Sequence, residues 1–177
     1  MAVFRNPQDP ADELPPHALP LEFQRQFGIE PDSVRVAHQV RASPILVARG
    51  SRGYCLIDAA GIVTNCWSTA VVNRGAATVA SLCGAGLSPN TIQLAGLVPN
   101  KVRNVGIVRG RRVVRTVPVV NNVFVAVLRA GDPLPYYLAY SGPGFEGVRR
   151  STGIPRSMKY ERCGASHEIP HRHAPRE

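Results

Sequence analysis

The stretch VRNVGIVRGRRVVRTVPVVNNVFVAVL, residues 102–128, decides the fold class of this chain. It is rich in β-branched Val, and its apolar runs are broken only by short polar turns, a composition typical of strands. Val102 to Val108 and Arg112 to Val120 lie on either side of Arg109-Gly110-Arg111. This arrangement predicts a β-hairpin.

A second turn follows at Asn121-Asn122, after which Val123 to Leu128 resumes the strand pattern. Pro118 has no N–H to donate to a neighbouring strand, so we expect it at a sheet edge or a break. The whole stretch therefore predicts three successive antiparallel strands.

Working outward, similar patterns predict further short strands at residues 34–40, 44–48, 53–58, 62–67, 76–82, 91–98 and 136–140. Residues 67–73 fit either a short helix or an irregular crossing. Short strands separated by Gly, Pro and Asn turns predict a mainly β fold, a small sandwich or a partly open barrel of antiparallel strands.

Residues 1–30 are expected to form an acidic, Pro-rich leader that ends in a short helix. Leu19, Phe23 and Phe27 recur at the spacing of one helix face. Gly28 follows at the position of a C-terminal cap.

The chain has 177 residues and a net charge of +9, which suits one globular domain. We expect the β domain to span residues 31–140. Residues 141–177 are dominated by Gly, Pro and charge, and they predict a mostly disordered basic tail.

Charge is divided unevenly along the chain, with −4 over residues 1–32 and +11 over residues 33–131. Two interpretations fit this division. The basic body could bind a polyanion such as nucleic acid, or the acidic leader could dock on the body of its own chain.

Cys55 and Cys66 lie directly opposite each other if Ala60-Gly61 is a two-residue hairpin loop. Opposed β-carbons are near disulfide reach, and the short loop implies about 2–3 kcal/mol of stabilisation. The alternative is two reduced core cysteines. Cys83 and Cys163 make the cysteine count even, and they either pair with each other or remain free thiols.

Cys163, His167, His171 and His173 bring together one thiol and three imidazoles, the ligand types of a tetrahedral Zn²⁺ site. Their spacing matches no familiar zinc module, and Pro170 prevents a regular helix turn between two of the histidines. We therefore expect a solvated polar tail, with neither a metal nor a cofactor.

Arg109, Arg111 and Arg112 lie at the predicted hairpin tip, with Lys101 and Arg103 on the same hairpin or its approach. These five residues form a candidate anion-binding site, because guanidinium groups suit phosphate and carboxylate. Nucleic-acid sites usually add exposed aromatic rings, and this part of the chain has none. Charged hairpin tips also serve as ordinary solubilising devices.

Candidate catalytic residues are few. Asp58 is the only carboxylate and His38 the only histidine within residues 33–131. A carboxylate pair for acid–base chemistry is therefore not expected there. A Cys66 or Cys83 nucleophile with His38 as base has no local sequence signature, and strand alternation predicts that His38 belongs to the core.

The first residues lack the apolar segment of a signal peptide. The uncharged run at residues 75–100 is long enough to span a bilayer, but polar residues at its centre argue against a transmembrane helix.

Several segments together resemble a group of small, uncharacterised actinobacterial proteins with a cysteine pair around a hairpin, a GLVPDGV turn and a VPVxxNVxV strand. The segments are Tyr54 to Ile57, Cys66, Leu94 to Asn100 and Pro118 to Val125. The resemblance covers roughly residues 4–128 and implies a membrane-anchored or exported protein of no established activity.

This chain departs from that pattern in lacking the anchoring segment, and in having Asn100-Lys101 where the family has Asp-Gly. The change matters if the turn requires a positive φ, which Lys adopts less readily than Gly.

These observations lead to a first hypothesis of a non-enzymatic binding or interaction domain, exported or surface-associated. The alternative is a cytoplasmic protein that binds nucleic acid or another polyanion through the basic hairpin. A Cys/His-dependent enzyme is a remote third. The resemblance favours a location outside the cytoplasm, and the absence of a signal peptide favours the cytoplasm.

Overall fold

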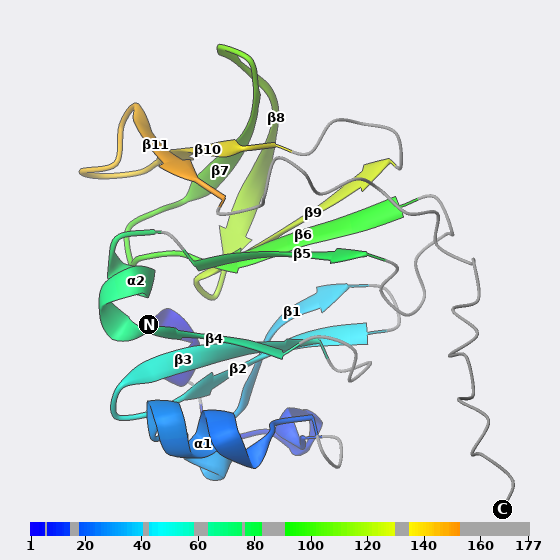
Figure 1. Cartoon of the computed structure of the whole chain (residues 1–177), viewed down its shortest axis with the longest axis vertical. Coiled ribbons are helices and arrows are strands. Elements are labelled where there is room, and N and C mark those ends of the chain that lie inside the picture. The colour runs from blue at the N-terminus through cyan, green and yellow to red at the C-terminus, as the bar shows by residue number, and fades with distance from the viewer. Residues whose placement is uncertain are drawn as a thin grey trace, which may run out of the picture.

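The computed structural model describes residues 1–5, 7–14, 18–40, 43–58, 64–75, 77–82, 91–129 and 135–152, and the description below concerns these. Two antiparallel β-sheets make up most of the molecule, with short helices beside them (Figure 1). The expected mainly β fold with a short N-terminal helix is confirmed.

The smaller sheet has four strands in sequence order, so each strand pairs with the next along the chain. Its strands are β1 (Arg35–Val40), β2 (Ser43–Arg49), β3 (Gly53–Asp58) and β4 (Thr64–Ser68). A short helix, α2 (Thr69–Asn73), follows β4 and leads into the second sheet.

The larger sheet has seven strands in the order β11-β10-β7-β8-β9-β6-β5 and curves into a half-barrel. Its strands are β5 (Ala77–Leu82), β6 (Thr91–Leu97), β7 (Asn104–Arg109), β8 (Arg112–Val120), β9 (Val123–Arg129), β10 (Tyr137–Ser141) and β11 (Val148–Ser151). The hairpin expected within residues 102–120 is β7–β8.

The burial of β9 explains why residues 123–128 form an unbroken apolar run. Phe124, Ala126 and Leu128 point into the half-barrel, whereas Val123 and Val125 pack toward the four-stranded sheet. A strand buried on both faces needs apolar residues at every position rather than at alternate ones. The half-barrel core and the core between the sheets therefore meet at β9.

The β8–β9 turn has the geometry that its sequence indicates. Asn121 and Asn122 have φ values of 51° and 66°, the pattern of a type I′ turn, in which Asn is favoured at both positions. The Asn122 side chain also donates to the Val98 carbonyl at 3.1 Å, so the turn is joined to the end of β6.

The leader forms 3₁₀ turns η1 (Ala2–Arg5) and η2 (Pro10–Asp12), then α1 (Leu21–Phe27) and η3 (Pro31–Ser33). Gly28 adopts the left-handed conformation at the end of α1, as expected for a C-terminal cap. Helix α1 and the partly buried Phe23 and Phe27 cover the face of the four-stranded sheet that points away from the larger sheet (Figure 1).

The larger sheet continues beyond residue 140, where the sequence pattern suggested its end. Strand β11 pairs with β10 from Tyr137↔Ser151 to Tyr140↔Val148. The remainder of the predicted tail, residues 153–177, lies outside the described residues, as do Cys83 and the four residues considered as metal ligands.

The two α-helices of the described residues, α1 and α2, have seven and five residues. Neither is long and apolar enough to cross a membrane.

Candidate functional site

The β7–β8 hairpin projects beyond the rest of the molecule and ends in a basic tip, residues 109–112 (Figure 1). Gly110 has a φ of 58° and open space around it, as a tight turn requires. Near the tip, Val113 and Val114 are 48% and 52% exposed. Two neighbouring aliphatic side chains are thus left in water by the fold itself.

The five basic residues singled out from the sequence form two groups rather than one. Arg109, Arg111 and Arg112 lie together at the tip. Lys101 and Arg103 precede β7 at the other end of the hairpin. Strand geometry puts Arg103 about 20 Å from Arg109, so a single small anion cannot contact both groups.

Arg149 joins the tip, although sequence reasoning missed it. Its guanidinium donates to the Arg111 carbonyl at 2.9 Å. Arg149 lies on β11, which reaches the hairpin through β10. The sequence assigned this segment to the tail, and the only available signal was the short alternating stretch Val148 to Ser151.

Among the described residues, β8 pairs with a strand on one edge only over most of its length. It pairs with β7 from Arg112 to Pro118, but with β9 only at Val119 and Val120. Beyond that point β8 and β9 diverge, and the Arg115 guanidinium crosses between them to donate to the Val127 carbonyl at 2.7 Å. Pro118, expected at a sheet edge or a break, lies where the pairing between β8 and β9 ends.

The two halves of the described chain differ sharply in charge. The leader, the helices and the four-stranded sheet, up to residue 75, carry six basic and seven acidic side chains. From residue 77 to residue 152 the described chain carries nine basic side chains and one acidic one, Glu146. The positive charge therefore belongs to the half-barrel and its hairpin.

The acidic leader docks on its own body, but away from the hairpin. Asp12 is 4% exposed and accepts from the Val36 amide at 2.5 Å and the Asp9 amide at 2.7 Å. Its carboxylate also lies 3.9 Å from Arg35 Nε. The leader therefore neutralises charge on β1 through Asp12 and Arg35 rather than charge at the hairpin tip.

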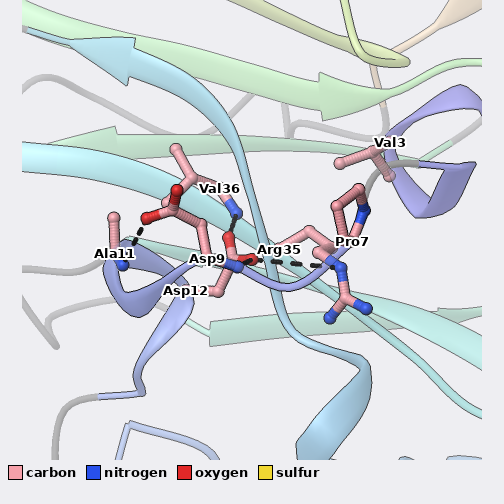
Figure 2. Close-up of a pocket in the computed structure, with 7 residues that line it drawn as sticks. All are labelled: Val3, Pro7, Asp9, Ala11, Asp12, Arg35 and Val36. Atoms are coloured by element: carbon pink, nitrogen blue, oxygen red, sulfur yellow. Dashed lines mark hydrogen bonds and ion pairs between the residues drawn. The ribbon is translucent and has the colours of Figure 1, made fainter.

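A pocket of about 450 Å³ lies between the leader and β1 (Figure 2). Asp12 reaches across it toward Arg35 and Val36, and Val3 and Pro7 supply apolar walls. Its volume suits a small molecule. However, both Asp12 carboxylate oxygens already accept hydrogen bonds from the protein, so the pocket's main acidic group serves to hold the leader.

Cys55 and Cys66 occupy opposed positions on β3 and β4 and form a disulfide, with 4.0 Å between their α-carbons. The expected register is thus confirmed. Cys55 is fully buried, in the core between the smaller sheet and the leader. With its sulfur bonded to Cys55, Cys66 is not available as a nucleophile.

His38 is half-buried near the end of β1, and partial burial lowers the pKa of its imidazole from the ordinary 6.5. The register of β1 shifts between Val36 and His38, and Ala37 is buried in the core between the sheets. This bulge breaks the alternation that grouped His38 with Val34 and Val36. Within the described chain no group of three potential metal ligands converges.

A comparison with protein-family models, with curated proteins and with solved structures finds no match to this chain.

Proposed function

We propose that this protein is a non-enzymatic binding domain and that the β7–β8 hairpin is its binding element. The observation that carries the proposal is a projecting hairpin whose basic tip is not neutralised by the acidic leader. The leader is bonded to β1 instead, through Asp12 and Arg35. The Arg111 and Arg112 guanidinium groups at the tip attract anions and steer their association.

The exposed side chains near the tip support a protein–ligand contact rather than a purely solubilising role. Val113 and Val114 lie beside Arg112 and Arg115 on β8. Solubilising tips need charge but no exposed aliphatic residues. Apolar side chains surrounded by arginines are typical of interface composition, in which Arg is enriched.

A second candidate function is nucleic-acid binding, which the same basic tip favours. Phosphate contacts by Arg supply most of the affinity in non-specific complexes. The sequences of β7 and β8 contain no aromatic residue on which a base could stack. The absence of stacking residues from the hairpin ranks this candidate below a protein ligand.

Titration of fluorescent anionic probes tests the proposal. The probes are an acidic peptide, single-stranded DNA and a heparin oligosaccharide, each at low and moderate salt. We expect Arg111→Ala/Arg112→Ala to weaken binding at least tenfold. If DNA is the ligand, the salt slope should fall by about 1.4, as for two lost contacts to a single strand.

The matched control is Arg5→Ala/Arg25→Ala, which removes two exposed arginines from the other half of the molecule. It makes the same change in net charge and should leave binding almost unchanged. An equal loss of affinity in both variants would show that net charge alone explains the effect. If no probe binds, the hairpin is not an anion-binding element.

We also propose that the protein matures in an oxidising compartment, as disulfide-bonded proteins do. The support is the Cys55–Cys66 pair and the resemblance to exported actinobacterial proteins. Alkylation at lysis, before and after reduction, followed by mass spectrometry, tests this. Cys55 and Cys66 should be labelled only after reduction, and labelling of both without reduction would contradict it.

A further inference from the structure

We propose that the hairpin binds an extended acidic segment of another protein by adding it as a strand to the free edge of β8. The free edge is defined as residues 112–118 on the side of β8 that faces away from β7. This inference rests on the proposed function and specifies its ligand class and binding mode.

The direction of the backbone groups defines this edge. The Val119 amide donates to the Arg103 carbonyl at 2.9 Å, toward β7. Successive residues of a strand point their N–H and C=O groups to opposite edges. The N–H and C=O groups of Thr116 and the C=O group of Pro118 therefore point away from β7. Among the described residues no strand pairs with β8 there, because β9 contacts it only at Val119 and Val120.

The side chains along the free edge suit a partner strand. Val113, Val114 and Thr116 are all exposed. Cross-strand contacts with β-branched residues are among the favourable pairs of antiparallel sheets. Main-chain hydrogen bonds would supply affinity and these side chains specificity, as in other examples of β-strand addition.

Charge identifies the partner as acidic. Arg111 and Arg112 lie along or beside the edge, Arg115 extends from it to the Val127 carbonyl, and Arg149 is bonded to the tip. The only acidic side chain in the described part of the half-barrel is Glu146. A strand with Glu or Asp at alternate positions would place carboxylates opposite these guanidinium groups.

A second copy of the chain fits the same edge poorly. Pairing of two β8 edges about a twofold axis would bring Arg112 and Arg115 of one copy close to the same residues of the other. Like charges on opposed strands are destabilising. We therefore commit to an acidic protein segment rather than to self-association.

The test uses the whole chain and a fluorescent eight-residue peptide that alternates Glu and Val. Its first control is the same peptide N-methylated at alternate residues, so that the edge facing β8 has no N–H donors. We expect the N-methylated peptide to bind at least tenfold more weakly. A Lys–Val peptide of equal length should not bind.

Variants of the protein separate pairing from charge. Thr116→Pro removes the N–H group that points away from β7 and should weaken peptide binding at least tenfold. Pro118, two residues later, already lacks such a group. Thr116→Val retains the N–H and should bind normally. Circular dichroism and thermal unfolding confirm that both variants are folded, and the N-methylated peptide gives the same information without altering the protein.

Each outcome decides between the two proposals. Equal binding of the two Glu–Val peptides, or binding lost in Arg111→Ala/Arg112→Ala but kept in Thr116→Pro, overturns strand addition while leaving anion binding by the hairpin intact. Binding of single-stranded DNA without binding of the peptide has the same meaning. Concentration-dependent dimerisation lost in Thr116→Pro would overturn the choice of partner, and no binding of any anionic probe would refute both proposals.

Discussion

Lys101 adopts a backbone conformation that its side chain disfavours. Its φ is 81°, in the left-handed region that costs an L-residue roughly 1–2 kcal/mol. The turn cannot relax easily, because a Cβ on Gly142 would lie 2.0 Å from the Lys101 carbonyl oxygen and the two backbones are therefore in close contact.

Lys101→Gly should therefore raise the free energy of unfolding. We expect a gain of about 0.5–1 kcal/mol. This is the backbone strain relieved in the folded state minus the cost of the greater conformational freedom that Gly gives the unfolded chain. Denaturant unfolding measures it. Lys101→Ala removes the same charge but keeps a Cβ, so a similar gain in that variant would show that the strain argument is wrong.

His38 should make stability depend on pH. Its pKa is lowered in the folded state by partial burial, so below 6.5 the unfolded chain binds protons more readily than the folded one. The contribution of His38 to the free energy of unfolding is therefore fully present above pH 6.5. It is lost as the pH falls through the lower pKa that His38 has in the folded state. Denaturant midpoints between pH 5 and 8 test this, and His38→Gln should flatten the profile in that window.

At the scale of secondary-structure elements, one hydrogen bond joins the end of α2 to β10. The buried Tyr140 hydroxyl donates to the Gly75 carbonyl at 2.7 Å. Gly75 has a φ of 74°, and a Cβ there would lie 2.4 Å from the Tyr140 ring. The chain thus enters the larger sheet at a point where only Gly permits the close approach.

Tyr140→Phe should lower the free energy of unfolding by about 1–3 kcal/mol, because a buried carbonyl loses its hydroxyl donor while the ring remains. Tyr137→Phe removes an equivalent hydroxyl from a side chain that is 46% exposed. We expect that control to change stability by less than about 0.5 kcal/mol. Equal effects in the two variants would contradict a special role for the Gly75 contact.

The β3–β4 disulfide should stabilise the smaller sheet by restricting the unfolded chain. Its cysteines are 11 residues apart, for which loop-closure entropy suggests about 2–3 kcal/mol. Reduction of a Cys83→Ser/Cys163→Ser variant should cost that amount in denaturant unfolding. The same reductant should have no effect once Cys55→Ala/Cys66→Ala is added.

The strands and the cysteine register could be predicted from the sequence because both depend on local patterns. Alternation, Val content and turn residues specify the hairpins, and Cys55 and Cys66 are close in sequence. The position of Arg149 could not be predicted, since β11 is four residues long and its pairing depends on β10 and β7. The bulge at His38 likewise arises from pairing with β2, which periodicity alone does not reveal.

At the scale of the whole molecule, the leader is part of the core rather than an appendage. Val3 is buried among residues of both sheets. Asp12 and Leu19 are buried on the side of the molecule that contains the smaller sheet. The sequence predicted an acidic, Pro-rich leader, and its charge left open whether it docked on the body of its own chain. Tertiary contacts with β1 determine the outcome.

Val3→Ala should therefore destabilise the entire protein, by about 2 kcal/mol for buried methyl groups and the space they leave. Leu21→Ala provides the control, because Leu21 is 67% exposed, and it should change stability by less than about 0.5 kcal/mol. A single unfolding transition shifted by Val3→Ala is expected. A separate early transition would show that the leader unfolds independently of the sheets.

The hydrogen bond between the Ala2 amide and the Asn122 side chain, at 2.5 Å, has a consequence for the order of events on the ribosome. Its two partners are 120 residues apart, and at ordinary rates of synthesis the second follows the first by on the order of ten seconds. During that interval the leader has emerged without the turn that it finally contacts. The contact between the first residues and this turn can therefore form only after Asn122 has been synthesised, although the rest of the leader can reach β1 earlier.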